Sequence, residues 1–270
     1  MVNSGENLII IGGAEDKKGD KMILQEVCSH IDKDSQLLVI ATVATEKPEE
    51  VGNEYSNIFT NMGIKNLSVL DVEKREDALK PENTELIEKA SLIFFTGGDQ
   101  LRITSILGGT PLYSSMKRRY TDGCVFVGTS AGASVMSDTM IVEGMDDESP
   151  RKCTLKLAPG LGLMNGIIID QHFAQRGRVG RLLVGVAENP EVLGIGIDED
   201  TSIIVNKDNV LRTVGTGAVY IIDGSNISDT NVSEQYPDNI LSIYDVKMHV
   251  LKNGDKFDFK NRRPLVDTRN

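Results

Sequence analysis

Cysteine, basic side chains and long apolar runs are all scarce in this sequence. Its three cysteines, Cys28, Cys124 and Cys153, are odd in number, widely spaced and free of any CxxC pair, so neither a disulfide framework nor a zinc site is predicted. No apolar run reaches the roughly 18 residues that span a bilayer. The opening MVNSGENLIIIGG also lacks the basic and apolar regions of a signal peptide. We therefore expect a cytoplasmic protein with reduced thiols.

The charge balance is acidic, with 29 lysines and arginines against 40 aspartates and glutamates and a net charge of −11. This balance argues against nucleic acid or a membrane surface as a partner. It is compatible with a cationic or zwitterionic substrate, although many soluble proteins are simply acidic. The 270 residues contain no Pro/Ser-rich linker, repeat or low-complexity tract, so we expect a single catalytic α/β domain over residues 1–270.

Short apolar runs alternate with amphipathic segments along the chain. Buried strands are expected at 8–13, 36–42, 67–72, 91–98, 124–130 and 166–173. Amphipathic helices are expected between them, at 21–31, 49–63 and 84–90. This alternation predicts a parallel α/β sheet. After about residue 193, the runs GIGID, TSIIVNKDNVLRTVG and AVYIIDG predict antiparallel strands added to the same sheet, with a hairpin at 206–209.

Glycine-rich or polar turns follow four of the expected strands: GGAED (12–16), TGGDQ (96–100), GTSAG (128–132) and DQHF (170–173). Ligand sites of open α/β sheets form beyond the carboxyl ends of strands, so these turns mark the expected site. GGAED lacks the G-x-G-x-x-G spacing, and Glu15 and Asp16 would repel a pyrophosphate, so no nucleotide is expected. Taken alone, TGGDQ needs no chemistry, because Asp99 can simply cap the helix of QLRITSIL.

The GTSAG turn fits G-x-S-x-G, the nucleophile elbow, between an expected strand and an expected helix. Its glycines allow a sharp turn that exposes the Ser130 hydroxyl, and the N–H of Ala131 would point at an oxyanion. Close helix-to-sheet packing explains the same small residues equally well. A nucleophilic serine also needs a base, so the motif is not sufficient by itself.

Only His172 of the three histidines lies on the expected active edge, at the end of the strand that contains IIID. His30 and His249 are more simply structural or solvated. A third group should orient the imidazole, and Asp170, Asp198 and Glu199 are all candidates. Asp170 shares a strand face with His172 at i−2, whereas Glu199 could approach from the far side of the ring, and spacing does not choose between them.

Downstream of His172, a segment of six positions contains three arginines: Arg176, Arg178 and Arg181. In the helix expected there, Arg178 and Arg181 share a face that adjoins an apolar stripe. A solvated basic face is the ordinary explanation of such a pattern. Beside the candidate base of an acidic protein, however, the guanidinium groups look like receptors for carboxylates, which they bind bidentately.

The combination of GGAEDK, FTGGDQ, GTSAGAS, DQHF with its arginines, and GIGIDEDT resembles the cyanophycinases. They belong to a serine peptidase family that also contains peptidase E, and the resemblance extends from about residue 8 to 223. It implies a three-layer α/β/α sandwich with a mainly parallel sheet, related to class I glutamine amidotransferases but with serine in place of the nucleophilic cysteine. It also implies hydrolysis of cyanophycin, a poly-aspartate that carries arginine on its side-chain carboxyls, to β-Asp-Arg dipeptides.

The resemblance further implies a role for particular residues. Ser130 would be the nucleophile, His172 the general base and Glu199 its orienting acid, with oxyanion N–H groups from Gly98 and Ala131. The β-aspartyl residue of the substrate would be held by Gln100, Asp170, Gln171, Arg176, Arg178 and Arg181. A homodimer is implied, and no metal or other cofactor is expected. The acidic EGMDDES loop at 143–149 could recognise arginine, although a solvated loop is the simpler interpretation.

Two alternatives stay open from the sequence. One is a peptidase E-like hydrolase of α-linked aspartyl dipeptides, against which the DQH sequence and the three arginines count. The other is a non-catalytic module that binds aspartyl or arginyl ligands, which the intact serine, histidine and glutamate disfavour. A glutamine amidotransferase is disfavoured because that chemistry uses a cysteine at the position of Ser130.

Overall fold

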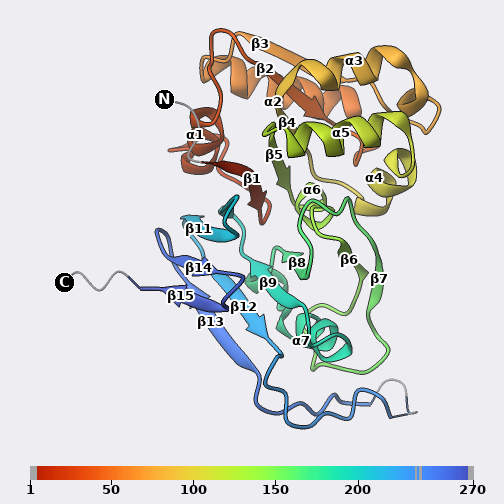
Figure 1. Cartoon of the computed structure of the whole chain (residues 1–270), viewed down its shortest axis with the longest axis vertical. Helices are drawn as coiled ribbons and strands as arrows, with labels where there is room; N and C mark the ends of the chain where they lie inside the picture. The colour runs from red at the N-terminus through yellow and green to blue at the C-terminus, as the bar shows by residue number, and fades with distance from the viewer. Residues whose placement is uncertain (1–4, 235, 237–238, 267–270) are drawn as a thin grey trace.

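The apolar runs of the first half of the chain form the parallel strands of the larger sheet. In the computed structural model, which describes residues 5–234, 236 and 239–266, its strand order is β15-β14-β11-β10-β1-β5-β4-β2-β3 (Figure 1). The bounds are β1 (Glu6–Ile11), β2 (Leu37–Ala41), β3 (Asn66–Leu70), β4 (Ala90–Phe95), β5 (Val125–Thr129), β10 (Thr201–Asn206), β11 (Val210–Gly215), β14 (Lys256–Asp258) and β15 (Arg263–Leu265). Pairing from β1 through β5, β4 and β2 to β3 is parallel, as the sequence predicts, and pairing from β1 through β10 to β15 is antiparallel.

Both faces of this sheet are covered near its centre, which explains the uninterrupted apolar runs of β1, β2, β4 and β5. In β1, Leu8 and Ile10 pack into one core and Ile9 and Ile11 into another. Successive strand residues point to opposite faces, so a strand between two helix layers must be apolar at every position. The result is a three-layer α/β/α arrangement, in agreement with the predicted fold class.

Helices supply the two outer layers. One face of the sheet packs on residues of α1 and α2, and the other on residues of α3, α4 and α5. The α-helices are α1 (Met22–Ser29), α2 (Pro48–Asn61), α3 (Pro81–Lys89), α4 (Gln100–Leu107), α5 (Pro111–Thr121), α6 (Ala131–Ser134) and α7 (Val179–Glu188), and short 3-10 turns occur at η1 (Asp77–Leu79) and η2 (Ala174–Arg176). Asp99 caps α4, because its side chain accepts from the N–H of Leu101 at 2.8 Å. In the part of the chain that the structure describes, no helix is long and apolar enough to cross a membrane.

A second sheet holds strands that the sequence assigned to the first. Its order is β13-β12-β9-β8, and it lies with α7 in the lower half of Figure 1. The bounds are β8 (Ile167–Gln171), β9 (Leu193–Ile197), β12 (Val219–Asp223) and β13 (Lys247–Leu251), and a separate hairpin joins β6 (Thr139–Glu143) to β7 (Lys156–Pro159). The prediction that 166–173, GIGID and AVYIIDG extend the main sheet is therefore wrong. The β10–β11 hairpin does extend it, and its pairing with β1 occupies the edge where β8 would have to lie.

The carboxyl ends of strands from both sheets form one region. In the main sheet β1, β4 and β5 end in register, with Ile11 opposite Thr129 and Phe95 opposite Gly128. In the second sheet β8 and β9 run parallel and end at Gln171 and Ile197. The predicted functional turns follow these ends, so the site is shared between two sheets.

Candidate active site

Ser130 occupies the turn between β5 and α6 in a backbone conformation that is rare for a residue with a side chain. Its φ is +53° and its ψ is −112°, and its N–H donates to the carbonyl of Ile11 at 3.1 Å. The flanking glycines are required by close contact: a Cβ at Gly128 would lie 2.1 Å from Gly132 O, and one at Gly132 would lie 2.4 Å from Phe95 O. The G-x-S-x-G spacing thus lets the helix start tightly against the sheet and leaves the serine side chain half-buried at the turn.

His172, which follows a strand of the second sheet, contacts this serine. It follows β8 with a φ of +48°, and its Nε2 lies 3.0 Å from Ser130 Oγ. Its Nδ1 lies 2.6 Å from Oε1 of Glu199, which stands two residues beyond the end of β9. An ionised carboxylate only accepts hydrogen bonds, so the imidazole proton belongs on Nδ1 and Nε2 can accept from the serine hydroxyl. Ser130, His172 and Glu199 form one chain of hydrogen bonds.

Burial sets the protonation state of the imidazole. It lowers the pKa of His172 below its ordinary value, while the hydrogen bond to Glu199 acts in the opposite direction. The positive charge of Arg176 also lowers this pKa. A histidine with a lowered pKa is neutral at pH 7, which is the form that can accept a proton from a hydroxyl.

The other candidates for the third position have different partners. Asp198 accepts from the backbone N–H groups of Ala174 at 2.9 Å and Ala218 at 3.0 Å, so it fixes the turn after His172. Asp170 lies among the arginines described below. Of the remaining histidines, His30 contacts Glu26 at 3.2 Å and the ring of His249 packs on Phe257, as expected for structural residues.

The backbone N–H groups of Gly98 and Ala131, near Ser130, have no acceptor within the described residues. Ala131 begins α6, and Gly98 has a φ of +147°. A Cβ at Gly98 would lie 2.2 Å from Ala44 O, and one at Gly97 would lie 3.7 Å from Ser130 Oγ. The glycine pair therefore fits between the β2 loop and the serine, where its amides are available to an incoming oxygen.

Two of the predicted arginines bind carboxylates of the protein itself. Arg181 donates to Asp170 through Nε at 2.6 Å and through Nη2, and Arg178 donates to Asp146 through Nε at 2.9 Å. Arg181 Nη1 also reaches Asp146 at 3.0 Å, and Arg178 Nη1 donates to the carbonyl of Gln171 at 2.7 Å. We call Asp146, Asp170, Arg178 and Arg181 the arginine–aspartate cluster. It ties the end of β8, directly before His172, to the start of α7.

This cluster bears on two details of the sequence analysis. Arg178 stands one residue before α7, as its N-cap, and its side chain lies on the same side as that of Arg181, because both bind Asp146 and Asp170. Asp146, from the EGMDDES loop, is neither simply solvated nor free to receive an external guanidinium, because both cluster arginines bind it. Buried arginines need such partners, and sequence alone does not identify them.

The remaining predicted binding residues differ in whether their polar side-chain atoms already have partners in the protein. Gln100 Nε2 donates to the carbonyl of Ile141 at 2.9 Å and so links α4 to β6. Gln171 is buried, yet its Oε1 has no hydrogen-bond partner among the described residues. Arg176 is exposed, and no hydrogen bond or ion pair joins its guanidinium to another described residue. Gln171 and Arg176 are the polar groups of this set that are available to a ligand.

One supporting residue was missed in the sequence analysis, which considered Glu15 only as a barrier to pyrophosphate. Glu15 is buried and accepts from Thr129 Oγ1 at 2.6 Å and from the hydroxyl of Tyr55. It thereby holds the turn after β1 against the residue that precedes Ser130. The signal was present, since Glu15 stands two residues after the Gly-Gly pair that ends a strand on the active edge.

Comparison with known proteins identifies the family of the chain. The model of peptidase family S51 matches residues 8–213. The chain belongs to peptidase family S51. It is 40% identical to a cyanophycinase of Geminocystis herdmanii over 261 residues, or 96% of each chain, and 36% identical to a cyanophycinase of Trichormus variabilis over 96% of this chain and 87% of that one. A peptidase E of Nostoc is 23% identical over 144 residues, which cover 51% of this chain and 57% of that one.

Solved structures support the S51 fold. A crystal structure of a peptidase from an acI-B1 actinobacterium superposes with a TM-score of 0.64 at 22% identity, covering 94% of this chain and 97% of that one. A candidate peptidase E from Listeria monocytogenes gives 0.55 at 15% identity, covering 78% and 99%. The family resemblance predicted from the motifs is thus confirmed, and the chain is an enzyme of the serine peptidase type.

Proposed function

We propose that this S51 enzyme hydrolyses cyanophycin to β-Asp-Arg dipeptides. The observation that carries the proposal is the hydrogen-bonded chain of Ser130, His172 and Glu199, with distances of 3.0 and 2.6 Å. The chain is also 40% identical to a cyanophycinase along nearly its whole length. The net charge of −11 suits a substrate that carries many guanidinium groups.

In the proposed mechanism, the turn at Ser130 is a nucleophile elbow. Ser130 Oγ attacks the backbone carbonyl of the substrate while His172 Nε2 takes the hydroxyl proton, and Glu199 stabilises the imidazolium that forms. The N–H groups of Gly98 and Ala131 bind the oxygen as it becomes negative. His172 then returns the proton to the leaving amine, and water attacks the acyl-enzyme by the same route.

We further propose how the aspartyl part of the substrate is held. Arg176, whose guanidinium is unpaired within the described residues, binds a substrate carboxylate, and the free Oε1 of Gln171 accepts from a substrate N–H. The arginine–aspartate cluster fixes the strand end that carries Gln171, and Gln100 fixes the start of α4 beside Gly98. In this proposal Arg178, Arg181 and Asp170 act on the substrate through these neighbours.

The second candidate is hydrolysis of α-linked aspartyl dipeptides. The matches to a peptidase E of Nostoc and to a candidate peptidase E of Listeria favour it. Both matches are weaker than those to the cyanophycinases, since the Nostoc match covers only 51% of this chain. We therefore rank it second.

Incubation with insoluble cyanophycin and with Asp-X dipeptides tests both candidates. We expect wild type to clear the polymer and release β-Asp-Arg, identified by mass spectrometry, and Ser130→Ala to be slower by at least about 10³-fold because it lacks the nucleophile. Ser29→Ala, which removes an exposed hydroxyl on α1, is the matched control and should match wild type. Clearing by Ser130→Ala would refute the nucleophile, and turnover of Asp-X alone would favour the second candidate.

We also propose that the enzyme acts in the cytoplasm as a homodimer. Its three cysteines are free, and burial raises the pKa of Cys28 to about 11 and that of Cys124 to about 12, so these two thiols resist oxidation. Free cysteines are typical of reducing compartments. Sedimentation of the purified chain measures its assembly state, and a monomer at micromolar concentration would contradict the dimer.

A further inference from the structure

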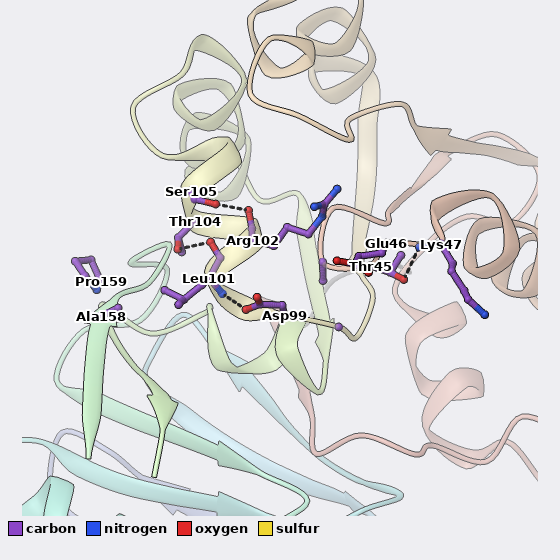
Figure 2. A pocket seen from close by; sticks show the side chains of 12 residues that line it. Thr45, Glu46, Lys47, Asp99, Leu101, Arg102, Thr104, Ser105, Ala158 and Pro159 are labelled. Carbon is purple, nitrogen blue, oxygen red and sulfur yellow. Dashed lines mark hydrogen bonds between the residues drawn. The ribbon is translucent and has the colours of Figure 1, made fainter. Parts of the chain in front are cut away.

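A pocket of about 960 Å³ opens beside the candidate active site. Figure 2 shows it between the loop that follows β2, with Thr45 and Glu46, and the first turns of α4. Gly98, one of the two proposed oxyanion donors, is part of its wall. Gly97 packs against Ser130, so only this residue separates the serine from Gly98 in the pocket wall. A substrate whose scissile carbonyl sits at Gly98 can therefore place a neighbouring side chain in this pocket.

The pocket contains two carboxylates that have no cationic partner. Asp99 accepts from the N–H of Leu101 through Oδ1, which leaves Oδ2 free, and Glu46 is exposed on the opposite wall. Among the described residues, neither side chain forms an ion pair. Both carboxylates are therefore available to a positively charged ligand.

The two cationic residues at the pocket are engaged elsewhere. Lys47 pairs with Glu50 at 3.2 Å, and Arg102 Nη2 donates to the carbonyl of Glu73 at 2.7 Å; neither glutamate lines the pocket. Figure 2 shows the charged ends of Lys47 and Arg102 directed away from Asp99. Neither positive group therefore forms an ion pair with Asp99.

The rest of the wall combines the hydroxyl residues Thr45, Thr104 and Ser105 with an aliphatic part. Ala44 lies on the β2 side, Leu101 belongs to α4, and Ala158 and Pro159 end β7. A ligand that combines a methylene chain with a cationic end matches this wall, because the chain can cover the apolar residues while the head reaches the carboxylates. An arginyl side chain has this composition, and its planar fork binds carboxylates well.

We propose that the pocket is a subsite for the guanidinium side chain of one arginyl residue of the substrate, with Asp99 and Glu46 as its acceptors. This inference rests on the proposed function and adds to it the part of the molecule that recognises arginine. The 143–149 loop is the alternative from sequence, but its Asp146 is already bound by Arg178 and Arg181.

Two synthetic oligomers test the subsite: three β-Asp-Arg units, and the same chain with citrulline, which has the shape of arginine without its charge. We expect wild type to have the higher kcat/KM on the arginine peptide. The double variant Asp99→Asn, Glu46→Gln should lower the ratio of the two kcat/KM values by about tenfold, mainly through KM, since each charged hydrogen bond becomes a weaker neutral one. Asparagine keeps an oxygen that can cap α4, so the fold is retained.

Glu85→Gln is the matched control, because it removes one exposed carboxylate on α3 outside the pocket and should keep the wild-type ratio. A double variant with the wild-type ratio would overturn the subsite and leave the proposed function intact. Tighter binding of the arginine peptide by the double variant would also overturn it, because it would place a substrate carboxylate in the pocket. Failure of wild type to cleave either peptide would instead refute the proposed function, and the subsite with it.

Discussion

Gly13 makes the closest approach to the proposed catalytic base. A Cβ at Gly13 would lie 2.4 Å from His172 Cε1 and 2.5 Å from Nε2. Non-bonded carbon atoms are best separated by about 3.5–4.0 Å, so alanine at this position would push the imidazole away by about 1 Å. A misplacement of about 1 Å costs on the order of 100-fold in rate. We therefore expect Gly13→Ala to lower kcat/KM by about 100-fold.

The chain provides a close control for this substitution. Gly123 has a φ of +96°, against +98° for Gly13, but a Cβ there would have no neighbour within 4 Å. Both alanine variants should lose about 1–2 kcal/mol of unfolding free energy, because alanine is strained at positive φ. Only Gly13→Ala should lose activity. Urea denaturation and initial rates on a soluble β-Asp-Arg peptide measure the two effects, and kcat/KM within threefold of Gly123→Ala would refute the reasoning.

Three other substitutions separate orientation of the base from support of the fold. Glu199→Gln should lower kcat by about 10–100-fold, because it replaces a charged hydrogen bond to His172 with a neutral one. Since Glu199 raises the pKa of His172 and the base must be neutral, the acid limb of kcat/KM against pH should move to lower pH, and a shift to higher pH would contradict this role. Asp170→Asn should cost about 3–5 kcal/mol in urea denaturation, because it leaves the buried guanidinium of Arg181 without its main partner. Asp146→Asn, at a half-exposed position, should cost about 1 kcal/mol, and equal losses would contradict the difference in burial.

Features set by neighbouring residues could be predicted from the sequence. The apolar runs gave the parallel strands, and the helices at 21–31, 49–63 and 84–90 correspond to α1, α2 and α3. The G-x-S-x-G spacing placed Ser130 at a strand-to-helix turn, because only glycine fits where backbone carbonyls approach within 2.1–2.4 Å of a Cβ. The family resemblance likewise rests on short motifs. Each of these patterns spans only a few residues along the chain, although the contact that requires glycine at 132 is with Phe95 in another strand.

Which carboxylate contacts Nδ1 of His172 could be identified only from the tertiary structure. The argument for Asp170 assumed an extended strand, on which residues at i and i−2 share a face. His172 has a φ of +48°, so the alternation ends there. Asp170 turns to the arginines while Glu199 reaches Nδ1 from the end of another strand.

The sequence by itself determined the parallel strands, the helices α1 to α3, the family and the candidate residues of the site. Only the tertiary structure decided which strands share a sheet, that Arg178 and Arg181 bind the protein's own carboxylates, and that a pocket containing Asp99 and Glu46 adjoins Gly98. The physical reason is the separation in sequence between the residues that interact. Strand and helix periodicity reports only whether a residue is buried, whereas its partner across the fold is set by packing between segments far apart in the sequence.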